Sequence, residues 1–247
     1  FGSCNLRILS PISKNPNLFS HKWISTSSSQ HSFAVSYLIN SLGFSPESAF
    51  SSSKYVNFKS PEKPDKVINL FKKYGFTQIQ ISSLCRRKPI LLSLDAEDII
   101  LPKLEFFEAK GFSGPEIAKM AYVFPNILAS SLTNQIMPSY DLIRNLFQSE
   151  EKVVVTVKRF PNILTHNIEK YVVPNVDILR EHGVPEFRIA RLMQDYAGCF
   201  ITTPHYFRKA VEKAVEMRFN ASNVNFVLAE NVLRWLSKSK WKSKSGG

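Results

Sequence analysis

Phe124-Pro125-Asn126-Ile127-Leu128 is repeated 36 residues later as Phe160-Pro161-Asn162-Ile163-Leu164, and the related word Lys88-Pro89-Ile90-Leu91-Leu92 precedes it by the same interval. One further step of 36 reaches Tyr196-Ala197-Gly198-Cys199-Phe200, a copy that has lost the proline. A second set of prolines keeps the interval, each 13 residues after a member of the first: Pro102, Pro138 and Pro174. A fixed period of this length indicates an array of repeated structural units.

Each unit predicts two short helices joined by a tight turn. Words such as Ser113-Gly114-Pro115-Glu116 place a capping serine, an early proline and a glutamate at a helix start. That helix should end before the first proline, because the residue preceding a proline is disfavoured in the α conformation. The second proline should lie in the first turn of the second helix, where its missing N–H costs nothing.

Glycines precede the capping words at the same interval, at Gly75, Gly111 and Gly183, with Phe147 standing where a fourth would be. An earlier unit, from about residue 31 to residue 74, is shorter, because Gly43 and Gly75 are 32 residues apart.

Apolar residues at helical spacing give the second helix of each unit one buried stripe. They are Ile100, Leu104 and Phe107, then Ile136, Tyr140 and Ile143, then Val172, Val176 and Leu179. Two short helices cannot bury such stripes alone, so neighbouring units must stack. The sequence therefore predicts an all-α fold, a right-handed-type α-solenoid superhelix of about five units.

The +12 formal charge of this 247-residue chain is unevenly distributed. The first 46 residues hold three cations and no carboxylate, and the serine-rich segment 1–30 is typical of a disordered organellar transit peptide, although an ordinary disordered tail would have a similar composition. Residues 201–247 carry a net +6, whereas residues 47–200 carry only +3. We therefore divide the chain into a transit peptide (1–30), a repeat solenoid (31–236) and a basic flexible tail (237–247).

The repeat resembles the mitochondrial transcription termination factor (mTERF) family, and most closely its land-plant members. The likeness rests on the repeat prolines, on the helix 101–107 (Leu-Pro-Lys-Leu-Glu-Phe-Phe) with its closing 109–112 (Ala-Lys-Gly-Phe), and on words at residues 36–40, 45–49 and 233–239. The resemblance implies units of two α-helices and a short 3₁₀ turn, a basic groove that holds nucleic acid, and a regulatory role in organelle gene expression. It implies double-stranded DNA or structured RNA as the partner, in the mitochondrion or alternatively in the chloroplast. The sequence departs from the family pattern in two ways. The proline is missing at Ala197, and a shortened carboxyl end puts the cap of the last unit in question.

The candidate nucleic-acid contacts are the basic residues in clusters, since backbone phosphates attract Lys and Arg. They are Arg86, Arg87, Lys88, Lys158, Arg159, Arg188, Arg191, Arg208, Lys209, Lys238 and Lys240. The first five lie just before repeat prolines and are equally explained as cations favoured at helix ends. The equivalent slots hold Tyr122-Val123 and Gln194-Asp195, which argues against a uniform phosphate track.

Catalytic, metal-binding and cofactor-binding motifs are absent from the sequence, and we expect neither an enzyme nor a cofactor. Cys4, Cys85 and Cys199 cannot form a disulfide framework or a zinc knuckle. No apolar run approaches the length of a membrane span, so we expect no membrane partner, and we expect a monomer. The rival functional class is a protein-binding solenoid that serves the organellar ribosome or RNA polymerase.

Overall fold

The computed structural model describes residues 28–216, and these residues are almost entirely helical. No strand occurs among them, which confirms the all-α repeat solenoid. The elements are α1 (Ser28–Leu42), α2 (Pro46–Ser53), α3 (Glu62–Lys73), α4 (Gln78–Arg87), η1 (Pro89–Ser93), η2 (Ala96–Ile100), α5 (Leu101–Ala109), α6 (Gly114–Val123), α7 (Asn126–Ala129), η3 (Leu132–Ile136), α8 (Met137–Phe147), α9 (Glu150–Arg159), η4 (Pro161–Thr165), α10 (Ile168–Glu181), α11 (Glu186–Phe200) and α12 (Pro204–Glu216).

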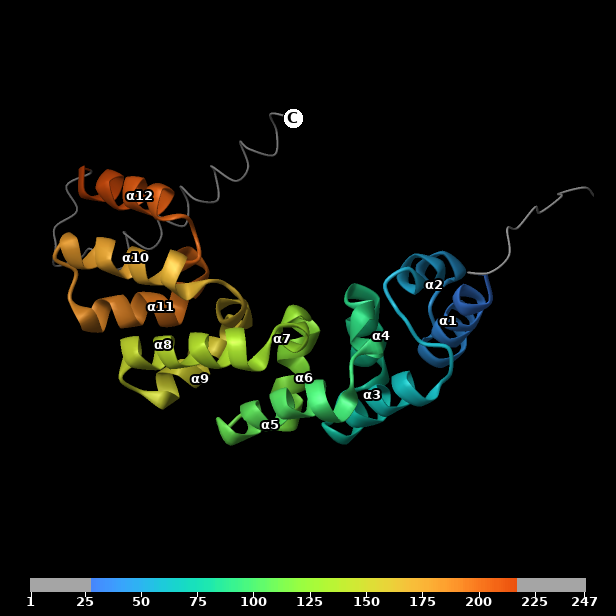
Figure 1. Ribbon diagram of the computed structural model, residues 1–247. Helices are drawn as coiled ribbons and strands as arrows, with labels where there is room; N and C mark the ends of the chain where they lie inside the picture. The colour runs from blue at the N-terminus through green and yellow to red at the C-terminus, as the bar shows by residue number, and fades with distance from the viewer. Residues whose placement is uncertain (1–27, 217–247) are drawn as a thin grey trace, which may run out of the picture.

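The helices follow the 36-residue period. The first helices α4, α6, α9 and α11 begin at residues 78, 114, 150 and 186. Their second helices are α5, α8, α10 and α12, and the pair α2–α3 forms a shorter unit at the amino-terminal side, preceded by α1. The units succeed one another along an open arc that runs from α1 and α2 to α12 (Figure 1).

Helix starts are capped as the sequence predicts. Thr77 forms a reciprocal capping box with Gln80, and the Ser149 hydroxyl accepts from the backbone N–H of Lys152. The backbone N–H of Ser113 donates to the Glu116 carboxylate over 2.9 Å. These contacts satisfy amide groups that have no partner inside the helix.

The turn between the two helices of a unit varies in form. It is a 3₁₀ turn at η1 and η4, but a four-residue α-helical turn at α7. In the copy without a proline, α11 continues to Phe200 and is broken by a non-helical residue, Tyr196 (φ −142°, ψ 38°). The repeat thus keeps a break at this position even without the proline.

The second proline lies in the first turn of the second helix in two of the three units, as predicted. Pro102 and Pro138 are the second residues of α5 and α8, but π-helical turns, η2 and η3, run directly into these helices. In α10 the prediction is wrong, because Pro174 is the seventh residue of a helix that begins at Ile168. The wider π turn is one way in which a helix accommodates a ring that would otherwise clash with the preceding turn.

The left-handed residue that ends most second helices is glycine at residues 43, 75, 111 and 183, all with positive φ. In α8 this conformation falls on Gln148 (φ 51°) and not on Phe147, because α8 extends as far as Phe147 and buries its ring. In this unit, which lacks the glycine, the left-handed conformation therefore falls one residue after the usual glycine position.

The nine stripe residues of α5, α8 and α10 and their flanking π turns are all buried, as predicted. The acidic residues at one shared repeat position, Glu105 and Asp141, are exposed, and the Asp177 side chain is about half exposed. The β-prone run 153–155 is helical within α9. The repeat period was thus a better guide to local structure than β-propensity.

Polar side chains, buried for Lys103 and Asn175 and half-buried for Gln135, join three of the units to the next turn, a feature that the sequence pattern did not predict. The Lys103 ammonium donates to the Leu128 carbonyl over 2.6 Å, and the Asn175 amide donates to the Phe200 and Thr202 carbonyls over 2.9 and 2.8 Å. Between them, Gln135 donates to the Leu164 carbonyl over 3.2 Å. Because Leu128, Leu164 and Phe200 are 36 residues apart, the same carbonyl is satisfied in three successive turns. We call these contacts the inter-repeat ties.

Candidate nucleic-acid interface

The two strongest basic words of the sequence lie at equivalent places in the fold. Arg86 and Arg87 end α4 and are followed by Lys88, whereas Lys158 and Arg159 end α9, two units further along. Cations are favoured at a helix carboxyl end, where backbone carbonyls lack partners. Each word borders a groove between its own helix and the first helix of the preceding unit.

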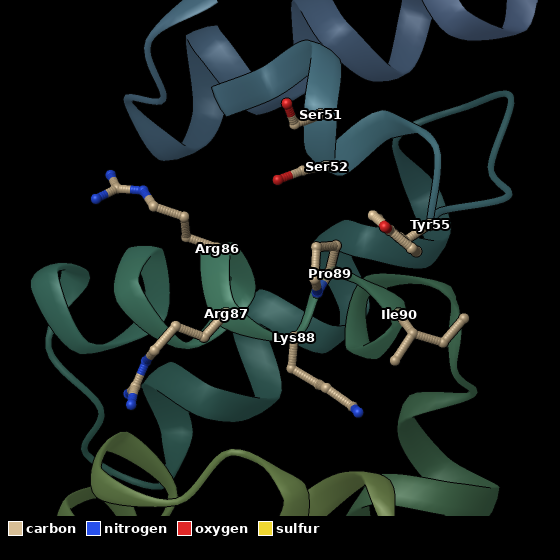
Figure 2. A pocket seen from close by; sticks show the side chains of 8 residues that line it. All are labelled: Ser51, Ser52, Tyr55, Arg86, Arg87, Lys88, Pro89 and Ile90. Atoms are coloured by element: carbon tan, nitrogen blue, oxygen red, sulfur yellow. The ribbon is translucent and has the colours of Figure 1, made fainter. Parts of the chain in front are cut away.

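The α2–α4 groove, which has a volume of about 410 Å³, is lined by α2 and the residues just after it, by the end of α4 and by the start of η1. Its polar side chains are Ser51, Ser52, Tyr55, Arg86, Arg87 and Lys88. No carboxylate is among its described lining residues. Figure 2 shows the three cations diverging from the end of α4 and the two serine side chains facing them from α2.

The two arginines of the α2–α4 groove contact neutral partners. The Arg86 guanidinium lies 5.1 Å from the centre of the Phe44 ring, and the Arg87 guanidinium lies 5.2 Å from the Tyr122 ring. Arg87 also donates to the Val123 carbonyl over 3.3 Å. Within residues 28–216, none of the three cations forms an ion pair. Their charges therefore stay uncompensated there.

The α6–α9 groove, of about 350 Å³, is the equivalent groove two units later, and its cations are compensated. Lys158 lies 2.9 Å from the Glu116 carboxylate, and Arg159 lies 3.0 Å from the Asp195 carboxylate. The hydrogen bond from Lys158 holds the pKa of Glu116 at about 2, below its ordinary value. This groove is built on the same repeat positions but carries ion pairs in place of free cations.

In the units that lack a basic word before the turn, the equivalent residue accepts a hydrogen bond from the arginine of the preceding unit. Arg87 contacts Val123, and Arg159 contacts Asp195, each 36 residues away in sequence. Arg191 also lies 2.7 Å from Asp195. The basic words therefore serve partly as contacts between units, and they do not form a uniform phosphate track.

The remaining candidates are not gathered into one site. Arg188 and Arg191 lie on α11, where the Arg188 guanidinium is 5.6 Å from the centre of the Phe187 ring. Arg208 pairs with Glu181 over 2.7 Å, which lowers the pKa of Glu181, while Lys209 is exposed on α12. Lys238 and Lys240 lie outside the described residues, as do most of the predicted transit segment and all of the predicted tail.

A second group of exposed cations was missed. Residues 54–73 place six lysines on α3 and on the segment between α2 and α3, all exposed: Lys54, Lys59, Lys63, Lys66, Lys72 and Lys73. With Arg86, Arg87 and Lys88 they give residues 28–94 nine cations against three carboxylates. Counting the charge of each unit separately would have revealed these cations. The net charge of +3 over residues 47–200 conceals them, because the later units contain more carboxylates. We call these nine residues the amino-terminal basic surface.

Other kinds of site have less support in the described part of the chain. No group of three His, Cys, Asp or Glu side chains there could hold a metal ion. Cys85 is buried, and burial raises the pKa of its thiol to about 12, which makes it a poor nucleophile. None of the described helices combines the length and apolar character that crossing a membrane requires.

Comparison with known proteins identifies one family. The mTERF family model matches residues 68–231, about two thirds of the chain. That family consists of non-enzymatic helical-repeat proteins, which are generally organellar, nucleic-acid-binding regulators of gene expression. No curated protein matches the chain.

Proposed function

Because the chain belongs to the mTERF family, we propose that it is an organellar factor that binds double-stranded DNA or structured RNA and regulates transcription termination or RNA processing. The observation that supports this function best is the amino-terminal basic surface, where nine cations outnumber three carboxylates and form no ion pair in the described part of the chain, with Asp95 of the next unit close enough to interact with Lys63 and Lys66. Uncompensated cations gain most from phosphates, because binding releases the counterions of the nucleic acid.

The compartment and the lineage belong to the same proposal. The acid-free, serine-rich amino-terminal segment favours import into an organelle, with the mitochondrion as our choice and the chloroplast as the alternative. The words at residues 36–40 and 45–49 support a land-plant member. Crosslinking of the protein to organellar RNA and DNA, followed by sequencing, would identify target and compartment together.

A salt titration tests the nucleic-acid role directly. Fluorescence anisotropy of the full chain with labelled duplex DNA and a labelled RNA hairpin should show affinity falling steeply as salt rises from about 50 to 200 mM. Replacing Lys63, Lys66 and Lys73 on α3 by Gln should reduce the slope by about 0.9 for each duplex phosphate that these lysines neutralise. The matched control neutralises three exposed lysines of later units, Lys119, Lys152 and Lys170.

Affinity that stays flat with salt, or that responds equally to both triple variants, would count against this surface as the binding site. The alternative function is that of a protein-binding accessory of the organellar ribosome or transcription machinery. The nearly balanced charge of residues 95–216, which contain 14 cations and 16 carboxylates, supports it. Co-sedimentation with organellar ribosomes without measurable affinity for either nucleic acid would favour it.

A further inference from the structure

The α2–α4 groove has two unlike sides. In Figure 2, Tyr55 and Ile90 lie on one side of Pro89, whereas Arg86 and Arg87 extend from the other. The Tyr55 and Ile90 side chains are both open to solvent, since these residues are 66% and 40% exposed. The groove therefore presents an aromatic and an aliphatic surface to solvent beside a set of cations.

This pairing distinguishes the α2–α4 groove from the equivalent groove two units later, while on the basic surface itself a second exposed ring, Phe50, lies beside Lys54. Phosphates need only cations, and the lysines of α3 supply those. An exposed aromatic ring beside the cations adds affinity for a ligand with a flat apolar face. In the equivalent α6–α9 groove, a carboxylate (Glu116) stands among the described lining residues, and no aromatic side chain does.

We propose that the α2–α4 groove binds an unpaired nucleotide segment, with a base stacked on Tyr55 beside Ile90 and the adjoining phosphates on Arg86, Arg87 and Lys88. This inference rests on the proposed nucleic-acid function. Stacking of a base on an aromatic ring together with backbone charge is how single strands are held with little sequence preference. Within a duplex, the faces of the bases are covered by their neighbours, so Tyr55 selects for unpaired segments.

The geometry of the cations suits a strand more than a single anion. Their side chains diverge, with Arg87 directed to Tyr122 and Val123, so their charges are spread along the end of α4 and not gathered at one point. Arg86 and Arg87 are also oriented in advance by the Phe44 and Tyr122 rings and by the Val123 carbonyl. Guanidinium groups that are already positioned lose less side-chain entropy when they bind.

The test compares one strand in two forms. Fluorescence anisotropy of the full chain would use a labelled RNA of mixed sequence, about 12 nucleotides long, which lies within the usual range of single-strand site sizes. The same strand would also be measured in a perfect duplex. Tyr55→Ala should weaken single-strand binding by about 5- to 150-fold, the equivalent of losing one stacked base, and should leave duplex binding unchanged. Tyr55→Phe should bind the single strand as the wild type does, because stacking does not need the hydroxyl.

The outcomes separate the two proposals. Equal affinity of wild type and Tyr55→Ala for the single strand, or an equal loss for single strand and duplex, would overturn the stacking site while leaving the nucleic-acid function standing. Failure of the wild type to bind either form at low salt would overturn the function itself. Because Tyr55 is exposed, its truncation should not unfold the protein, and an unchanged Tm in a thermal melt would verify this.

Discussion

Residues 28–94 and residues 95–216 are built from the same repeat but differ in their balance of charge. The first region has nine cations, three carboxylates and no ion pair among its described side chains. The second has 14 cations and 16 carboxylates, and eight ion pairs form among its described side chains. A shared backbone plan therefore does not impose a shared binding surface.

The two regions also differ in how neighbouring units are joined. The repeat position of Lys103 and Asn175 is filled in α3 by Val67, which is fully buried. The first junction thus relies on apolar packing at this position, whereas later junctions have a buried hydrogen bond to the next turn. The comparison teaches that polar groups, both buried and exposed, distinguish units whose apolar cores are alike.

The largest effect is expected from breaking an inter-repeat tie. Asn175→Val would place in α10 the residue type that α3 has at the equivalent position, Val67. It would also leave the carbonyls of Phe200 and Thr202 without the donor that Asn175 provides. Loss of the donor to the buried Phe200 carbonyl should lower the free energy of unfolding by about 1–3 kcal/mol, less the gain from removing Asn175 Oδ1, which is buried without a hydrogen-bond partner. Urea denaturation measures this, with Asn69→Val on the exposed surface of α3 as the control. An unchanged midpoint for Asn175→Val would show that the tie contributes nothing.

A second experiment compares the two grooves by removing their cations. Arg86→Gln, Arg87→Gln and Lys88→Gln together should reduce the salt dependence of single-strand affinity by about 0.7 for each phosphate that these cations neutralise. Lys158→Gln with Arg159→Gln should change it much less, because Glu116 and Asp195 already compensate those cations. Anisotropy titrations at several salt concentrations give both slopes. Equal reductions per charge in the two grooves would contradict the distinction drawn between them.

A smaller change should convert one groove into the other. Ser48 follows the capping residue Ser45 by three positions in α2, as Glu116 follows Ser113 in α6. Ser48→Glu should complete a capping box, adding about 0.5–1 kcal/mol to stability, and should compensate Arg86. Thermal melts and anisotropy should then show a more stable protein that binds nucleic acid more weakly. Ser48→Gln is the control, since it can complete the capping box without the charge.

The smallest effect concerns acid. Since the folded-state pKa of Glu116 is lowered to about 2, the stability that its pairing with Lys158 provides is complete above the ordinary pKa near 4.3 and is lost as the pH falls toward 2. Both side chains are partly exposed, so the contribution should be under about 1 kcal/mol. A carbon-13 NMR titration should find that Lys158→Gln raises the pKa of Glu116, whereas Lys119→Gln does not. A Glu116 pKa unaffected by Lys158→Gln would refute the pairing in solution.

Local structure was predictable where one residue type enforces one conformation. Prolines and capping residues marked the turns and helix starts, and the apolar stripes marked the core. The π-helical turns before Pro102 and Pro138 were not predictable, because the same proline in α10 is accommodated without one. Gln148 was missed because its left-handed conformation depends on where α8 ends.

The candidate site was predictable only in part. The basic words before the repeat prolines were found, but their compensation was not. The lysines of α3 were present in the sequence and were missed because most of them are spread along the helix and none precedes a repeat proline. Tyr55 gave no signal at all, since one tyrosine among many aromatic residues shows its exposure only after folding.

The amino-acid sequence by itself determined the repeat, its period, the approximate helix boundaries and the apolar core, because these depend on neighbours a few residues apart. Only the tertiary structure decided which cations remain free. Lys158 meets Glu116 and Arg159 meets Asp195 because stacked units bring together residues that are 42 and 36 positions apart, while no carboxylate of the described chain lines the α2–α4 groove beside Arg86, Arg87 and Lys88.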